Sequence, residues 1–504
     1  MCAGKTGFAR TSLEGTYKPL LPSTPQDILE GIVMYLEVQG ERQLFMSVDF
    51  GQFARSWCTE IRERMAAQLG LPGDAIIFHC THNHSGPTNE DYVTHRFPLD
   101  NLVACLVRLS REAIAAAVPA RMACAAADVG NQYSLCRRKW INDDVANVTN
   151  WYGYRNDMPR GSTANHLIRE RLHRWFGPDF PNPDWLAEAI YYDNPVDPLV
   201  QVLEFTDEHD RPLGGVIRFA AHPHLMLAAE PNAYATDYCG PARRWLDTAC
   251  GGIHLFAEGP QCNLVPRETI EYVSNPNRLN WADSPYGPDG SLVARDSDHL
   301  RREVRAMGEA LAIRGNQALR RAEFKPLRSL EVRTRWHDLP MRADVPANSE
   351  IAWAIRDDWD RKIKHALREG VSIIQMKRLT DQYNRIHWMK KMLDEWYLPT
   401  AEEIAKKRLP VHLEAIRLND AIIVGLPAET GLETSLWLRA HTVGNNLITL
   451  QQCNGDIGYL ISAQDRRGGD YEAMCSLIAE YGLTVLHQGV MDLLAQLNVA
   501  GHFG

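Results

Sequence analysis

The chain has 504 residues, of which 45% are hydrophobic and 23% are charged, as is typical of a globular protein with a buried core. Its 35 glycines and 28 prolines are scattered, which excludes a fibrous or disordered chain. The formal net charge of −9, without a basic stripe, excludes a nucleic-acid partner.

Strands and helices alternate in the first quarter of the chain. Two β-rich runs joined by a turn predict a hairpin over 31–49. Helical spacing of apolar residues predicts helices over 53–69, ended by Gly70, and over 99–117, and apolar runs predict strands over 75–80 and 120–129. This alternation favours an α/β fold.

The later part of the chain combines further strands with two unusual segments. Residues 140–192 are rich in aromatic residues, Asn, Asp and Pro, which indicates a long insertion that either stacks on a sugar ring or forms an aromatic mini-core. Charged, helix-periodic residues predict a helical hairpin over 348–398. Other elements are predicted over 199–205, 215–221, 411–417, 421–426 and 446–452 (strands) and 489–497 (a closing helix).

Cysteine usage and the chain's hydropathy indicate the compartment. The 11 cysteines include no C-x-x-C pair, so we expect buried free thiols. The first 20 residues have no apolar signal-peptide region, and no run approaches the ~18 apolar residues of a membrane span. A cytoplasmic protein without a membrane span is therefore expected.

Metal-binding and polar residues follow several predicted strands. His82 and His84 come after the strand at 75–80, and His222 and His224 follow the strand that ends at Ala221. Pro427-Ala428-Glu429 and the segment 454–459 follow two later strands. Because open α/β sheets bind ligands beyond the carboxyl ends of their strands, we expect these residues to meet in one site.

These segments resemble the neutral ceramidases and the wider group of ceramidase-like zinc hydrolases. That family has, in order, H-x-H-S-G-P, F-x-x-H-P, S-D-x-x-G-x-A, G-D-x-S/N-P, P-G-E and N-x-Y-x-x-Y segments. The corresponding residues here are 82–87, 219–223, 236–242, 262–266, 427–429 and 454–459. The resemblance implies one catalytic domain over 1–504, built on a large mixed β-sheet flanked by helices.

The resemblance also implies one zinc ion, held by His82, His222, Glu429 and Tyr459. Imidazole nitrogens and hard oxygen donors suit this ion and leave room for a water. Zinc lowers the pKa of such a water to about 7, so that it can attack a carbonyl at neutral pH. As an alternative, His224 replaces His222 as a ligand.

Three further residues correspond to catalytic positions of the family. His84 is expected to face the substrate as a proton shuttle or oxyanion donor. Arg137 is expected to bind a substrate oxygen, with Arg138 as the fallback. Asp237 is expected to orient a ligand histidine, and its alternative is an ordinary turn or helix-cap aspartate.

The sequence also departs from the family pattern. Val265 stands where ceramidases have a serine, so a serine-dependent mechanism does not apply and metal-activated water remains. Gln464-Asp465-Arg466 replaces E-E-Y, which puts a cation where a tyrosine faces substrate and favours a polar or anionic substrate. The chain ends at Gly504 without room for the family's C-terminal β-sandwich, which makes membrane-lipid substrates doubtful.

Three functions remain at this point. The first is a zinc-dependent hydrolase that cleaves an amide or ester in a small, soluble polar substrate other than ceramide itself. The second is a zinc-dependent lyase or hydrolase that acts on a sugar acid or glycoconjugate, and the third is a catalytically inactive binding relative. The third predicts lost metal ligands, whereas all four ligand types are present. A homo-oligomer is left open.

Overall fold

A nine-stranded mixed sheet forms the centre of the computed structural model, which describes residues 4–17, 28–89, 99–141, 146–149, 195–229, 233–267, 297–371, 373–444 and 446–501. The strand order is β11-β10-β9-β5-β1-β2-β3-β4, with β13 paired to β5. Its pairs are antiparallel except β10–β11 and β3–β4. The strands are β1 (Lys5–Ser12), β2 (Glu30–Val38), β3 (Glu41–Val48), β4 (Ile76–Cys80), β5 (Val118–Asp128), β9 (Leu199–Asp207), β10 (Pro212–Phe219), β11 (Ile253–Glu258) and β13 (Lys325–Pro326).

A second, four-stranded sheet packs on one face of the large sheet. It consists of β14 (Leu330–Pro340), β15 (Arg408–Leu418), β16 (Ala421–Gly425) and β18 (Leu447–Leu450) in that order. One hydrophobic cluster contains Ile32 and Met34 of β2 together with Ile416 of β15 and Ile448 of β18. Their neighbours Val33 and Tyr35 belong to a different cluster with helices. The period of two along β2 therefore buries both faces of the large sheet.

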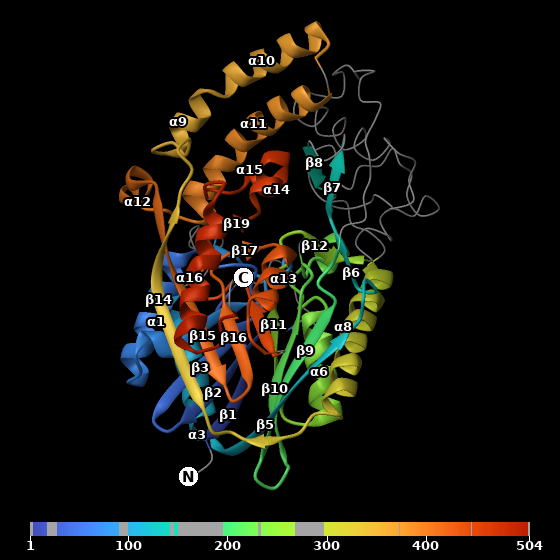
Figure 1. Ribbon diagram of the computed structural model, residues 1–504, viewed down its shortest axis with the longest axis vertical. Helices are drawn as coiled ribbons and strands as arrows, with labels where there is room; N and C mark the ends of the chain where they lie inside the picture. Colours follow the sequence, from blue (N-terminus) through green and yellow to red (C-terminus); the bar gives the residue numbers. More distant parts are fainter. Residues whose placement is uncertain are drawn as a thin grey trace.

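Helices cover the outer faces of both sheets (Figure 1). The large sheet is covered by α1 (Arg55–Leu69) and α3 (Leu99–Ala115) on one half and by α6 (Cys239–Cys250) and α8 (Ser297–Leu319) on the other. The small sheet is covered by α13 (Leu432–Ala440) and α16 (Gly482–Gln496). The predicted mixed sheet flanked by helices is confirmed, and the second sheet adds a layer that local patterns did not indicate.

The closing helix begins earlier than predicted. We expected it over 489–497, with a glycine at its start, but α16 begins at Gly482. A Cβ on Gly489 would lie 2.7 Å from Leu413 and 2.9 Å from His337, so this glycine permits close packing of the helix on the small sheet. Gly489 therefore lies inside the helix because of a tertiary contact, and it does not mark the start of the helix.

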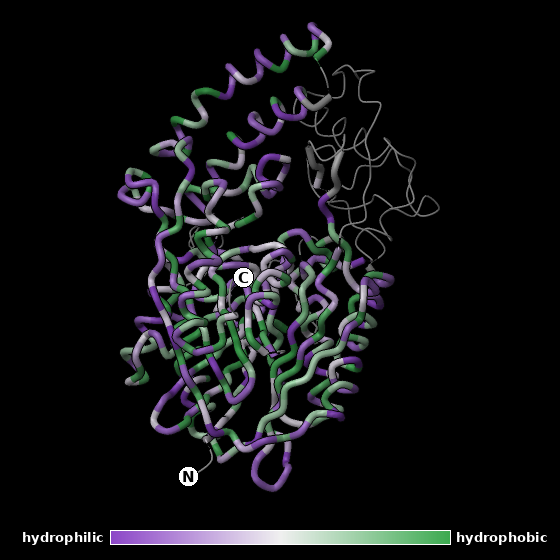
Figure 2. The backbone as a smooth tube through the Cα atoms, viewed as in Figure 1, coloured by the Kyte–Doolittle hydropathy of each residue, from purple (hydrophilic) through white to green (hydrophobic). Residues whose placement is uncertain are grey.

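Helices lie within the stretch where a helical hairpin was predicted. They are α9 (Ser349–Ala354), α10 (Arg356–Glu369) and α11 (Ile373–Lys391), followed by a π-helical turn, η3 (Met392–Trp396). A further short helix, α12 (Ala401–Lys406), comes after the predicted stretch. Ile363 and Ala366 of α10 pack against Met376 and Tyr383 of α11. Figure 2 shows hydrophobic residues concentrated in the sheets and hydrophilic residues along both hairpin helices.

The other predicted insertion lies largely outside the described residues. Of 140–192, the structure describes only the ends of a small hairpin, β7 (Arg138–Ile141) and β8 (Ala146–Thr149), so the prediction stays open. Each cysteine in the described ranges is a free thiol. Within those ranges, no helix has both the length and the apolar character that crossing a membrane requires.

Candidate metal centre

The predicted ligands come together at the strand ends beneath α14 (Ala463–Gly468) and α15 (Tyr471–Met474) (Figure 1). His82 follows β4, and His222 follows β10. Two short strands, β17 (Glu429–Thr430) and β19 (Tyr459–Leu460), pair in parallel with Glu429 opposite Tyr459. Residues opposite each other in a parallel pair point to the same side, so the carboxylate and the phenol are neighbours.

Glu429 lies close to two histidines, at about the donor separations that a tetrahedral metal site needs. Glu429 Oε2 lies 3.2 Å from His82 Nε2 and 3.4 Å from His222 Nε2. Two donors that each lie 2.0–2.1 Å from a tetrahedral zinc ion are roughly 3.3–3.5 Å apart. These three side chains are at most 4% exposed. The arrangement therefore fits a small cation of zinc's size.

Both histidines are oriented by backbone carbonyls. His82 Nδ1 lies 2.9 Å from the carbonyl oxygen of Gly51, and His222 Nδ1 lies 2.9 Å from that of Leu264. Donation from Nδ1 leaves the lone pair of each Nε2 facing the centre, as in metal-bound histidines. His222 Nε2 and Glu429 Oε2 have no hydrogen-bond partner in the described part of the chain. A bound cation would satisfy both buried atoms.

His84, which we expected to face the substrate, lies close enough to the candidate ligands to bind the metal itself. Its Nε2 is 3.3 Å from His82 Nε2, and His82, His84 and His222 form a group whose ligand atoms lie within 4.8 Å of one another. An extended i, i+2 pair would point to opposite sides, but His82 has a left-handed φ of 55° that turns the chain. Two ligand sets are therefore possible, one with Glu429 and Tyr459 and one with His84.

The charges of the centre are coupled. Burial lowers the pKa of His82, but the nearby Glu429 carboxylate outweighs burial and raises it to about 9. Burial raises the pKa of the Glu429 carboxyl, yet His82 and His222 hold it well below its usual range. Without a metal, a proton on His82 balances the Glu429 charge. A metal ion would take the place of that proton.

Arg137 contacts the candidate ligand Tyr459, and Arg138 does not. Arg137 Nη2 donates to Tyr459 Oη at 3.5 Å, and its Nε donates to Glu472 Oε1 at 3.0 Å. Arg138 instead pairs with Asp465. Sequence reasoning missed the role of Glu472, which lies on the short helix α15.

The expected contact between Asp237 and a ligand histidine is not formed. Its carboxylate accepts hydrogen bonds from the backbone N–H groups of Met226 and Tyr238, both at 2.8 Å. Asp237 has a left-handed φ of 47° and is buried, which raises its pKa to about 6. Asp237 therefore ties its own turn to the start of α5 (Leu225–Ala229), which agrees with the alternative of a turn or cap residue.

His224 lies beside the centre and outside the group of close donors. Its ring centroid is 5.5 Å from that of His222 and 5.7 Å from that of His84. The described group with mutually close ligand atoms contains His222 and not His224. The structure therefore favours His222 as the ligand over the alternative in which His224 replaces it.

The two departures from the family pattern lie in different surroundings. Val265, on β12 (Leu264–Pro266), is fully buried against Leu135. Arg466 donates to the backbone carbonyls of Ala473 and Ile478, which fix the direction of its guanidinium group. It lines a separate cavity beside the helical hairpin.

Two more buried carboxylates surround the candidate ligands. Burial and nearby Glu429 raise the pKa of Asp456 to about 7, and burial raises that of Glu258 well above its usual range, partly offset by His82. Sequence reasoning found Asp456 within the segment 454–459 but missed Glu258, which ends β11 without a recognisable motif. Both groups can balance the charge of a divalent cation.

Comparison with solved structures identifies the fold. A neutral ceramidase from Pseudomonas aeruginosa superposes with a TM-score of 0.61 at 15% identity, over 99% of this chain and 75% of that one. A ceramidase complexed with C2 gives 0.59 at 14% identity, over 99% and 76%. No family model and no curated protein sequence matches the chain. The chain therefore has a ceramidase-like fold, as the sequence motifs indicated.

Proposed function

We propose that the chain is a zinc-dependent hydrolase that cleaves an amide or ester bond in a small polar substrate. The observation that supports this most directly is the buried group of His82, His222 and Glu429, whose donor atoms are 3.2 and 3.4 Å apart and partly unsatisfied. The ceramidase-like fold supports hydrolysis at the level of reaction class. The donor set of imidazole and oxygen suits zinc.

In this proposal, His82, His222, Glu429 and Tyr459 hold the zinc ion. When bound, zinc supplies a water with a pKa lowered to about 7 and polarises the substrate carbonyl. Burial and Glu429 raise the pKa of the Tyr459 phenol well above its usual range. Arg137 acts through Tyr459, because its charge opposes this shift and favours the ionised oxygen that would bind a cation. The Gly51 and Leu264 carbonyls keep the imidazoles in the binding tautomer.

His84 is proposed to move the proton during bond cleavage. Its ring lies 4.9 Å from that of His82, and it is the more exposed of the two, so it can reach both the ligands and an entering substrate. A positioned imidazole of this kind contributes roughly 10²–10⁴-fold to proton transfer. Val265 cannot act as a nucleophile, so water remains the attacking group.

The test begins with elemental analysis of the purified protein and of a His82→Ala, Glu429→Ala double variant. We expect about one zinc per chain in the wild type and none in the variant. A His365→Ala, Glu402→Ala variant is the matched control, because both residues are exposed on helices outside the centre. If neither the wild type nor the control binds zinc even when it is supplied, the proposal is wrong.

Activity is then screened on amides, esters and uronate glycosides with zinc-loaded and chelator-treated protein. Hydrolysis in ¹⁸O-labelled water puts the label into the product, whereas elimination leaves an unsaturated product without it. Zinc-dependent label incorporation supports the hydrolase. An unlabelled, unsaturated product would assign the lyase reaction instead.

A further inference from the structure

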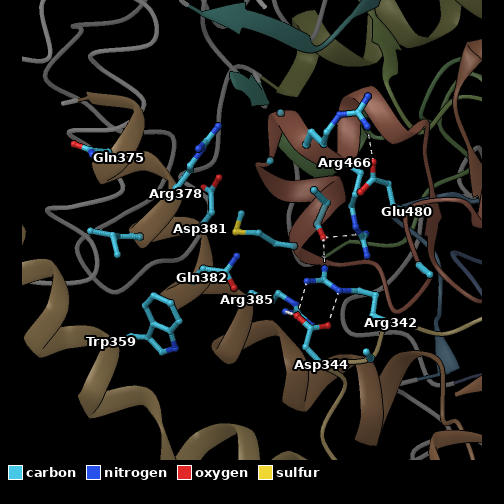
Figure 3. Close-up of a pocket in the computed structure, with 18 of the residues that line it drawn as sticks. Arg342, Asp344, Trp359, Gln375, Arg378, Asp381, Gln382, Arg385, Arg466 and Glu480 are labelled. Carbon is cyan, nitrogen blue, oxygen red and sulfur yellow. Dashed lines mark hydrogen bonds and ion pairs between the residues drawn. The ribbon is translucent and has the colours of Figure 1, made fainter. Parts of the chain in front are cut away.

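A cavity of about 880 Å³ lies between the helical hairpin and α14, apart from the metal centre (Figure 3). α15 separates the two sites: its Tyr471 ring lies 5.5 Å from that of Tyr459, whereas Ala473 and Met474 line the cavity. Cavities of this size hold drug-sized ligands.

Guanidinium groups are concentrated on one side of this cavity. Arg342 and Arg385 both form two hydrogen bonds with the carboxylate of Asp344, with distances of 2.9 Å for both bonds from Arg342. Arg342 and Arg466 both donate to the carbonyl oxygen of Ala473, at 3.2 and 3.3 Å. Two guanidinium groups thus share one carboxylate, and the third is held by backbone carbonyls, which leaves an excess of positive charge.

The excess charge is incompletely satisfied by the protein. Arg385 is only 7% exposed, and its Nε has no hydrogen-bond partner in the described ranges. Burial and the charge of Arg342 lower the pKa of Arg385 to about 10 despite Asp344. Burial, with the charges of Arg342 and Arg385, also lowers the pKa of Arg466. An anion in the cavity would relieve this repulsion.

The other acidic groups of the cavity are already paired. Asp381 accepts from the buried Lys377 at 2.6 Å, and Glu480 pairs with Arg467 at 2.5 Å. Arg378 of α11 is exposed and also lines the cavity. Figure 3 shows Arg378, Arg385 and Trp359 on the hairpin side of the cavity and Arg342 and Arg466 on the other side.

Apolar side chains form the remaining wall. Trp359, Val371 and Leu379 line the hairpin side and Met474 lines the α15 side. Trp359 presents an aromatic surface, with Lys362 Nζ 4.3 Å from its ring centroid. The cavity therefore combines an electropositive side with an apolar and aromatic side.

We propose that this cavity binds a small organic anion, with its carboxylate or phosphate against Arg385, Arg466 and Arg378 and its apolar part against Trp359 and Leu379. A planar guanidinium matches either oxyanion through paired N–H groups. The site is independent of the metal centre and of the proposed hydrolase activity.

The test is isothermal titration of the full-length, zinc-loaded protein with four probes: 3-phenylpropionate, its neutral amide, phenyl phosphate and inorganic phosphate. We expect saturable 1:1 binding of at least one phenyl-bearing anion, and the amide should bind at least about tenfold more weakly. The tighter of the two phenyl anions identifies the head group. Equal affinity for 3-phenylpropionate and its amide would overturn the proposal, and inorganic phosphate as the tightest probe would overturn the assignment of an organic ligand.

Variants locate the binding in the cavity. Arg385→Gln and Arg378→Gln should each lower the affinity for the preferred anion, and Arg385→Gln should lower it by about tenfold or more. Arg305→Gln, on the exposed face of α8, should leave this affinity unchanged. Arg378 has no described ion pair, so its variant tests the site even if Arg385→Gln fails to fold. Unchanged affinity in Arg378→Gln, or loss of binding in His82→Ala, would overturn the proposal.

Discussion

Replacement of Glu429 by glutamine is expected to weaken zinc binding by roughly 100-fold while the fold is retained. Glutamine has nearly the same shape and can still accept a hydrogen bond, but it lacks the charge that faces His82 Nε2 at 3.2 Å. A bound cation would lie at least as close to this carboxylate as His82 Nε2 does, and a unit charge at 3.2 Å is attracted by about 5 kcal/mol at an effective dielectric constant of about 20. If half of this is offset by solvation, the zinc affinity falls by about 2–3 kcal/mol, which is roughly 100-fold.

The assay is a competition titration, in which zinc is partitioned between the protein and a chromophoric chelator of known affinity. Glu402→Gln is the matched control, because Glu402 lies on α12 with a side chain that is 74% exposed. Circular dichroism and thermal unfolding of the metal-free proteins check that both variants fold.

A His84→Gln variant makes the test decisive. If Glu429 is a ligand and His84 moves the proton, His84→Gln keeps its zinc and loses roughly 10²–10⁴-fold in turnover. Wild-type zinc affinity in Glu429→Gln, together with loss of zinc in His84→Gln, would refute this reasoning. The ion would then be held by the group of three histidines.

Three further predictions concern the surroundings of the centre. Glu472→Gln leaves the Arg137 cation buried without its carboxylate, and we expect a loss of about 3–5 kcal/mol in the free energy of urea unfolding; a loss below 1 kcal/mol would contradict this. His254, buried between two carboxylates, has a pKa raised to about 9 from 6.5, so its stabilisation is full below pH 6.5 and is lost as the pH rises through 9. Between these pH values the wild type should therefore lose about 3 kcal/mol of unfolding free energy that His254→Gln does not lose. An equal pH dependence in the two proteins would contradict this prediction. In Gly458→Ala, the new Cβ would lie 2.1 Å from the Tyr397 ring, at a residue whose φ is 81°. We therefore expect a lower melting temperature and weaker zinc binding, both measured by calorimetry. Gly130→Ala is the control, because φ is also positive there but no atom lies within 4 Å of the new Cβ.

Local periodicity predicted the strand that leads to His82 and its neighbours in the sheet, but not the short strands that carry Glu429 and Tyr459. The hairpin of β2 and β3, the strand β4 and the helix α1 with its left-handed Gly70 cap all agree with the predicted ranges within a few residues. These elements have regular apolar patterns and clear turn residues, which are properties of neighbouring residues. The predicted start of the closing helix was wrong, because Gly489 permits close packing of the helix on the small sheet and does not mark a helix end.

The ordered motifs of the sequence determined the kind of fold and the strand ends at which the candidate ligands lie. Only the tertiary structure decided which side chains meet: His84 joins the histidine group, Asp237 binds backbone N–H groups, and Glu472 holds Arg137. The partners Glu472 and Arg137 lie 335 positions apart in the chain. Whether such residues touch depends on how the sheets and helices pack, which is set by the burial of whole apolar faces and is not encoded in the few residues around either partner.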